Sequence, residues 1–481
     1  MLEIIKLEIV LQQFQNITTY QDALRSKSIT CVEAVNYYIQ QIEAKKHLNA
    51  FINTYPKEAL QQAAVLDTLA ENDWKPLHGV VIAIKDVLNY KGFPVTAASR
   101  MLENYSSIYN ATSVQRLLDN GAIIIGSCNC DEFAMGSSNE NSAFGNVLNA
   151  ADESRVPGGS SGGSAVAVQA GLCMASLGSD TGGSVRQPAD FCGIVGYKPT
   201  YGRISRYGLI AYASSFDNVG IFANNVEDVS VILNCIAGSD AADGTSIQTS
   251  YKGDLTEPAQ KLKFAYLKPT IDLPGLNPEI KLALEEYFKK LQDLGHTVTA
   301  IDFDLLDFIV PTYYVLTTAE ASSNLSRYDG VRYGYNSGGS LPLDDFYKQN
   351  RSNGFGKEVK RRIMLGSFVL SSGYYDAYFN KAQQIRKLIV DKTKSIFEDY
   401  DALLMPVSPH TAFKFGEKSG DAVSMYLADI YTVYANLAGI PAISIPKFTH
   451  SNGMPFGFQI HTKSQSDSEL LNIADYLTKV N

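Results

Sequence analysis

The sequence predicts an α/β fold built around a layered sheet. Between residues 76 and 240, segments with helical periodicity alternate with short apolar runs that are typical of buried strands. A further helix–strand unit follows at residues 279–301, and two later apolar runs, Ala402–Met405 and Ala442–Ile445, are predicted strands. No internal repeat or clear linker interrupts the chain, so we expect a single domain over residues 1–481.

The elements can be justified in chain order. Residues 1–75 are predicted to be helical, because the segment 33–42 places apolar groups at helical spacing. In the core at 76–240, a helix over Ser113–Leu118 should end near Gly121. The run Ala122–Ile125 that follows has the continuous apolar character of a strand buried on both faces.

The second half of the chain contains a helix, a strand and a less regular segment. A helix over Glu279–Leu294 should stop at Gly295, and His296–Ile301 should return as a strand. Residues 305–360 are rich in Tyr, Ser and Gly and are the least periodic part, so we predict a lid or a partner surface there. Helical signals resume after residue 361.

Composition restricts the function and the compartment. The net charge of −9 disfavours direct nucleic-acid binding as the main role, and the short basic cluster Lys360–Arg362 is typical of a solvated helix face. No apolar run reaches the ~18 residues of a membrane span, and Met1–Lys6 lacks a signal-peptide pattern. Six cysteines are too few for a disulfide scaffold. We expect a cytoplasmic protein with no membrane association.

One cysteine pair has to be considered as a metal site. Cys128 and Cys130 form a C-x-C pattern, but no second pair or histidine follows at zinc-site spacing. Buried thiols are the better interpretation, and we expect no metal.

A lysine ends the first strongly apolar run. Lys85 follows Val80–Ile84, and a lysine buried at the end of such a strand can have its pKa lowered from ~10.4 to ~7–8, which makes it a usable base. The alternative is that Lys85 marks the strand end, where it reaches water or pairs with Asp86.

A glycine- and serine-rich loop, Gly158–Ser164, allows several interpretations. A phosphate-binding loop fails because no lysine follows the glycines. A hydrolase elbow fits the pattern Gly159–Gly163, but the preceding polar residues and Pro157 do not form a buried strand. A strained turn entering a helix at Ala165–Ala170, with fixed serine hydroxyls, is the third possibility. A flexible linker is the fourth.

A second motif, Gly178–Ser184, offers backbone donors beside a hydroxyl. The N–H groups near residues 181–184 could surround an oxyanion formed at Ser184. The alternative is an ordinary surface turn. Ser184 would also need a base, and none of the six histidines belongs to a visible triad motif.

Together these residues resemble the amidase signature family. The segment Gly158–Pro199 carries that family's glycine/serine signature, and the spacings between Lys85, Ser160 and Ser184 match its Lys–Ser–Ser triad. The likeness covers nearly the whole chain. It implies the amidase-signature fold, an α/β fold in which helices cover both faces of a large mixed central sheet.

The resemblance also assigns catalytic roles. Ser184 would be the acyl-forming nucleophile, and Ser160, held by a cis peptide bond, would bridge it to a neutral Lys85. The oxyanion hole would be formed by backbone N–H groups of Thr181, Gly182 and Gly183.

Three further stretches, at 131–145, 198–208 and 361–376, resemble the glutamine-hydrolysing subunits of tRNA-dependent amidotransferases within that family. This likeness implies glutamine as substrate, with Arg362 for its α-carboxylate and Asp429 for its α-amino group. A structural ion pair is the alternative role for both residues. Arg186 and Asp180, which flank the nucleophile, are expected to form a structural ion pair.

The same likeness implies partners. Two further subunits, named B and C in that enzyme, would complete it. The B subunit would use ATP and Mg²⁺ and hold most of the tRNA, so no cofactor is expected in this chain. Tyr434 departs from the family pattern, as do Ser127, Cys128 and Cys130. A free-standing amidase for another small amide and a non-catalytic scaffold are the competing functions.

Overall fold

A mixed sheet forms the centre of the computed structural model, which describes residues 16–258, 260–338, 341–418 and 428–480. Within these residues the sheet has 11 strands in the order β1-β3-β2-β4-β6-β5-β10-β11-β9-β7-β8. The strands are β1 (Phe51–Thr54), β2 (Val81–Lys85), β3 (Ile123–Cys128), β4 (Ala175–Asp180), β5 (Val195–Lys198), β6 (Asn218–Ala223), β7 (Lys263–Leu267), β8 (Thr297–Ile301), β9 (Ala402–Pro406), β10 (Ala442–Thr449) and β11 (Pro455–His461).

Parallel pairing at two places explains where the functional residues gather. Strand β2 runs parallel to β3 and to β4, and β7 runs parallel to β8 and β9, while the remaining pairs are antiparallel. Lys85 is the last residue of β2 and Asp180 is the last residue of β4. Because the carboxyl ends of neighbouring parallel strands meet at one edge of a sheet, both residues lie at the place where ligands bind in such folds.

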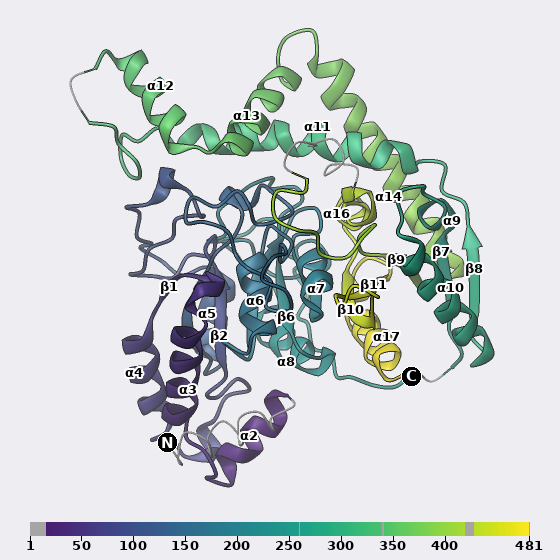
Figure 1. Cartoon of the computed structure of the whole chain (residues 1–481), viewed down its shortest axis with the longest axis horizontal. Coiled ribbons are helices and arrows are strands. Elements are labelled where there is room, and N and C mark those ends of the chain that lie inside the picture. The colour runs from purple at the N-terminus through teal and green to yellow at the C-terminus, as the bar shows by residue number, and fades with distance from the viewer. Residues whose placement is uncertain (1–15, 259, 339–340, 419–427, 481) are drawn as a thin grey trace.

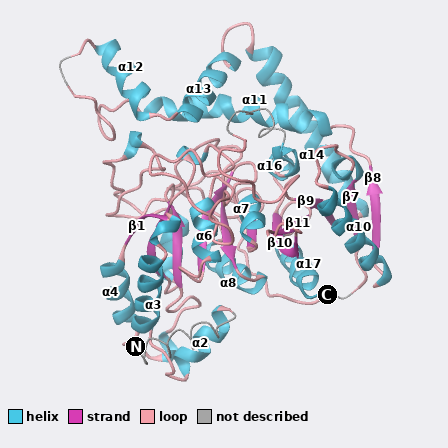
Figure 2. Cartoon of the chain, in the orientation of Figure 1, coloured by secondary structure: helices cyan, strands magenta, loops and turns pink. Residues whose placement is uncertain are grey.

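Helices cover both faces of the sheet (Figures 1 and 2). Alternate residues of β2 enter different cores: Val81 and Ala83 pack in one buried cluster, Ile82 and Ile84 in the other. The helices are α2 (Ile17–Arg25), α3 (Cys31–Ala44), α4 (Pro56–Leu66), α5 (Thr112–Asp119), α6 (Gly162–Gln169), α7 (Arg186–Cys192), α8 (Val226–Ile236), α9 (Lys268–Ile271), α10 (Pro278–Asp293), α11 (Leu306–Asn324), α12 (Leu343–Gly354), α13 (Lys357–Val369), α14 (Lys381–Asp399), α16 (Val433–Ala438) and α17 (Asp467–Lys479).

The predicted α/β class and mixed sheet are confirmed, and most elements lie where the sequence placed them. Helix α5 and strand β3 match the predictions at 113–118 and 122–125. Helix α10 ends before Gly295, whose φ of +89° favours glycine, and β8, β9 and β10 occupy the other predicted strands.

Two segments differ from the predictions. The segment 1–75, predicted helical, contains β1, which pairs antiparallel with β3; its residues 1–15, including Met1–Lys6, lie outside the described residues. The segment 305–360, predicted irregular, holds the long helix α11 and helix α12. Many side chains of α11 are buried against other elements, so its apolar residues are not confined to one face. The sequence therefore shows no clear helical periodicity there.

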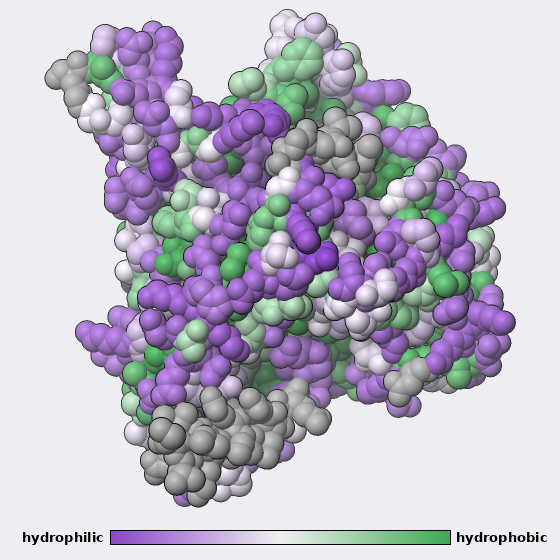
Figure 3. Space-filling view, viewed as in Figure 1, coloured by the Kyte–Doolittle hydropathy of each residue, from purple (hydrophilic) through white to green (hydrophobic). Residues whose placement is uncertain are grey.

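Helices α11, α12 and α13 form a layer along the top of the molecule in Figure 1. The segment 364–378, at the end of α13 and beyond it, exposes a set of apolar and aromatic side chains: Met364, Leu365, Phe368, Leu370, Tyr374, Tyr375 and Tyr378. On the face seen in Figure 3 hydrophilic residues dominate, and apolar residues are interspersed among them. Among the described helices, none combines the length and the apolar character that crossing a membrane requires.

Candidate active site

Lys85 is enclosed by three serine hydroxyls. Its side chain is fully buried, and Nζ donates to Oγ of Ser160 at 2.7 Å, of Ser161 at 2.9 Å and of Ser179 at 2.9 Å. Burial lowers the pKa of Lys85 to about 8. The alternative in which Lys85 reaches water or pairs with Asp86 is therefore wrong: the Asp86 carboxylate instead accepts hydrogen bonds from Thr96.

The hydrogen bonds around Lys85 are compatible with proton acceptance from Ser160. A neutral amine donates two hydrogen bonds and accepts one. Ser161 donates its own hydroxyl proton to the carbonyl oxygen of Ser179 at 3.1 Å, so Ser161 Oγ can only accept from Lys85. The acceptor position on a neutral Nζ is then open to Ser160, the nearest of the three hydroxyls, or to Ser179.

The glycine-rich loop is a constrained turn that leads into α6. Gly158 has a φ of +81°, the Gly159–Ser160 peptide is cis, and Ser160 and Ser161 are fully buried. The loop therefore fits neither a flexible linker nor an elbow that follows a buried strand. Glycine is required at Gly159, because a Cβ there would collide with Asp131.

The motif at 178–184 is buried rather than a surface turn. Asp180 organises it: one carboxylate oxygen accepts the N–H of Gly183 at 2.9 Å and the other accepts the N–H of Val185 at 3.1 Å. The backbone is thus held on both sides of Ser184. Of the three N–H groups that the resemblance places in an oxyanion hole, that of Gly183 donates to Asp180, which leaves those of Thr181 and Gly182 as candidates for that role.

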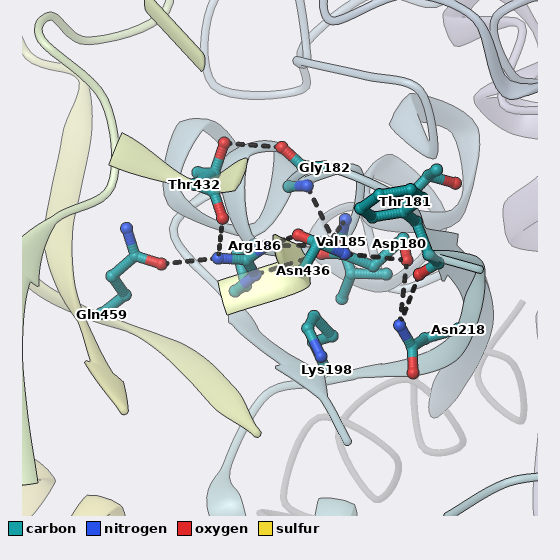
Figure 4. A network of polar contacts seen from close by, with 12 residues as sticks. Asp180, Thr181, Gly182, Val185, Arg186, Lys198, Asn218, Thr432, Asn436 and Gln459 are labelled. Atoms are coloured by element: carbon teal, nitrogen blue, oxygen red, sulfur yellow. Dashed lines mark hydrogen bonds and ion pairs between the residues drawn. The ribbon is translucent and has the colours of Figure 1, made fainter. Parts of the chain in front are cut away.

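Asp180 is held in turn by Arg186, as Figure 4 shows. Both side chains are fully buried, and the guanidinium donates to the carboxylate at 3.1 and 3.2 Å. Arg186 also donates to the side chains of Asn436 and Gln459 and to the carbonyl oxygen of Thr432. The prediction of a structural ion pair at Asp180 and Arg186 is confirmed.

The two predicted substrate-binding residues come from distant segments and lie together. Arg362, on α13, donates to Tyr212 Oη at 2.7 Å and to Glu358 at 2.9 Å. Arg362 therefore lines the pocket and also forms an ion pair with Glu358, the structural role that the sequence had left open. Asp429 opens the 3₁₀ turn Asp429–Tyr431 and accepts a hydrogen bond from Tyr314 Oη at 2.5 Å. Burial raises the pKa of Asp429 to about 6, against the effect of the Tyr314 hydrogen bond and of Arg362.

One pocket, whose empty space is about 330 Å³ including its open mouth, joins these groups. The pocket is lined by Ala134, Gly136, Ser137, Gly159, Gly182, Gly183, Ser184, Gln187, Tyr313, Arg362, Asp429 and Thr432. The hydroxyl of Ser184, the backbone of Gly182 and Gly183, a guanidinium and a carboxylate thus line the same space. An amide whose other end carries an ammonium and a carboxylate fits this arrangement of charges.

Several groups that could have suggested other chemistry lie elsewhere. None of the six histidines, all within the described residues, lines this pocket. Cys128 and Cys130 are free and fully buried, and burial raises the pKa of both thiols. Tyr434 packs in the core and accepts a hydrogen bond from Thr393 at 2.9 Å, so this departure from the family pattern points away from the pocket.

The sequence did not reveal some residues that build the site. Ser161 and Ser179 stand inside the two motifs, so their contacts with Lys85 could have been suspected from position alone. Tyr313, Tyr314 and Thr432 carry no local signal, because they reach the pocket or Asp429 only after α11 and α16 have packed.

Comparisons with known proteins agree with this geometry. A family model described as Amidase matches residues 33–471. Two relatives carry the name of the A subunit of Glutamyl-tRNA(Gln) amidotransferase. The one from Legionella pneumophila (strain Paris) is 48% identical and covers 94% of each chain. The one from Chlorobium phaeobacteroides (strain BS1) is 47% identical and covers 96% of this chain and 98% of the relative. A crystal structure of the same A subunit from Thermotoga maritima superposes with a TM-score of 0.76 at 40% identity, covering 93% of each chain.

Proposed function

This chain belongs to the amidase family, and we propose that it is the glutamine-hydrolysing subunit of an aspartyl/glutamyl-tRNA amidotransferase. In this function it releases ammonia for the ATP-dependent conversion of Glu-tRNA(Gln) to Gln-tRNA(Gln). The observation that carries the proposal is the single pocket that joins Ser184 to Arg362 and Asp429, with the buried Lys85–Ser160 pair behind it. The near full-length relatives that bear the amidotransferase name support it.

The reaction begins with attack on the side-chain amide. Ser184 Oγ adds to the amide carbon while its proton passes to Ser160 Oγ, and the proton of Ser160 passes to the neutral Nζ of Lys85. The N–H groups of Thr181 and Gly182 stabilise the oxyanion. The proton then returns through Ser160 to the amide nitrogen, the C–N bond breaks, and ammonia leaves a glutamyl ester on Ser184.

The second half repeats the transfer with water. Lys85, neutral again after ammonia leaves, removes a proton from water through the same hydroxyl. The water oxygen adds to the ester carbon, and collapse of the second oxyanion returns the proton to Ser184 and releases glutamate. Arg362 binds the α-carboxylate and Asp429 binds the α-ammonium throughout, so the amide carbon stays beside Ser184.

The proposed partners are the B and C subunits of the amidotransferase. The B subunit would use ATP and Mg²⁺ to activate the tRNA-bound glutamate and would hold most of the tRNA, in keeping with the net charge of −9 on this chain. The exposed apolar side chains at 364–378 offer a surface for such a partner. This surface lies beyond the segment 305–360, for which the sequence predicted a lid or partner surface. We place the protein in the cytoplasm.

A glutaminase assay on the full chain tests the proposal. Ser184→Ala should lower kcat by at least about 10³-fold. Ser164→Ala is the matched control, because Ser164 lies in the same cluster but bonds the carbonyl oxygen of Leu177 outside the pocket, and it should retain activity. Undiminished hydrolysis by Ser184→Ala would contradict the catalytic assignment, and a higher kcat/KM for a neutral amide than for glutamine would favour a free-standing amidase.

A further inference from the structure

The peptide bond between Gly182 and Gly183 joins two glycines of the oxyanion loop, so no Cβ on either residue hinders its rotation. Glycine flanks it on both sides, and Gly183 has a φ of +121°, which side-chain-bearing residues rarely adopt. If this peptide turned over, the Gly182 carbonyl oxygen could face the pocket, where negative charge develops on the substrate. A carbonyl oxygen at that place would repel the oxyanion.

Two side chains hold the peptide at its opposite ends. Its N–H donates to Asp180 at 2.9 Å, and its carbonyl oxygen accepts the hydroxyl of Thr432 at 2.7 Å. Thr432 is itself fixed, because its own carbonyl oxygen accepts Arg186 at 2.8 Å and Arg186 binds Asp180. The contacts form a closed ring that joins Gly182 and Gly183 to the buried side chains of Asp180, Arg186 and Thr432. Figure 4 shows these three side chains beside Gly182.

Packing restricts the same peptide from both sides. A Cβ on Gly183 would collide with Thr432, and a Cβ on Gly182 would collide with the Tyr313 hydroxyl. Thr432 also follows the 3₁₀ turn that begins at Asp429, and its N–H donates to the Asp429 carbonyl oxygen at 3.0 Å. The residue that holds the oxyanion loop is therefore attached to the turn that carries the proposed amino-group ligand.

We propose that Thr432 is a positioning residue for catalysis: its hydroxyl keeps the Gly182–Gly183 peptide in the orientation that turns the Gly182 carbonyl oxygen away from the developing oxyanion. The inference rests on the proposed amide hydrolysis at Ser184. Thr432 acts on the loop rather than on the substrate's charges. Its loss should therefore slow glutamine and a neutral amide such as butyramide by the same factor, without weakening the binding of either.

The test measures kcat and KM for both amides in variants of the full chain. Thr432→Val keeps the shape of the side chain but removes the hydroxyl. Its kcat should fall by roughly 10- to 100-fold, a smaller fall than the loss of a whole oxyanion donor causes. Its KM should stay within about twofold of the wild-type value. Thr432→Ser should restore kcat to within about threefold of the wild type. Thr393→Val is the control, since it removes a buried threonine hydroxyl that bonds Tyr434 away from the pocket; it should keep kcat.

Three outcomes would overturn the inference: an unchanged kcat in Thr432→Val, a Thr432→Ser variant as slow as Thr432→Val, or a raised KM with normal kcat. If Thr432→Val does not fold, Thr432→Ala compared with Thr432→Ser serves the same purpose, because the two differ by one oxygen atom. Ser184→Ala separates this inference from the proposed function. An inactive Ser184→Ala beside a fully active Thr432→Val would remove the inference alone.

Discussion

The rate of amide hydrolysis should rise with pH because Lys85 must be neutral to accept a proton. Burial lowers the pKa of Lys85 to about 8. A group with that pKa is neutral in about one tenth of the molecules at pH 7 and in about nine tenths at pH 9. The kcat/KM should therefore increase close to tenfold over this range and level off above it, with a tenfold fall per unit well below pH 8.

A neutral amide is the appropriate substrate for this profile. The α-amino group of glutamine titrates in the same range, whereas butyramide carries no ionisable group. Asp429, with a pKa of about 6, is already charged at pH 7, and it does not contribute to the rise. A kcat/KM that stays flat between pH 6.5 and 9, with the chemical step limiting, would refute the role of Lys85. Lys85→Arg keeps its charge at every pH tested and should be inactive throughout.

Three other predictions follow from the same contacts. Asp429→Asn should raise the KM for glutamine at least about tenfold, by loss of a charge-assisted hydrogen bond, while leaving the KM for butyramide unchanged; equal effects on both amides in steady-state kinetics would contradict amino-group recognition. Arg186→Met leaves Asp180 buried without its cation, so the free energy of unfolding should fall by ~3–5 kcal/mol in a urea titration, and an unchanged midpoint would contradict this. Gly183→Ala should abolish glutaminase activity, because its Cβ meets Thr432 at a φ of +121°; an active variant would show that the loop adapts.

Local patterns were enough to predict several strands of the sheet and to single out the two segments that contain Lys85 and Ser160. The apolar run before Lys85 indicates a strand, and the glycines around Ser160 allow a tight turn. That Lys85 is buried, and that the loop is a constrained turn, follows only from the packing of the folded chain. The strand β1 could not be predicted from a local pattern. Its four residues are a strand because they pair with β3, and that pairing partner lies far along the chain.

The rest of the site depends on tertiary packing. Tyr314 reaches Asp429 across 115 positions, and Thr432 reaches Gly182 across 250. No spacing rule predicts such contacts, since they exist only once α11 and α16 have packed over the pocket. The Lys360–Arg362 cluster shows the same limit: Arg362 turns into the pocket and is buried, although the run resembled a solvated helix face.

The most direct test of the central claim is to trap the nucleophile. An electrophilic glutamine analogue, followed by peptide mass spectrometry, should label Ser184 in the wild-type chain and in Ser164→Ala. Labelling should fall by at least about 10²-fold in Ser160→Ala and in Lys85→Met, where the route for the proton is broken. An adduct on another residue, or wild-type labelling of Ser184 in either of those two variants, would contradict the relay from Ser184 through Ser160 to Lys85.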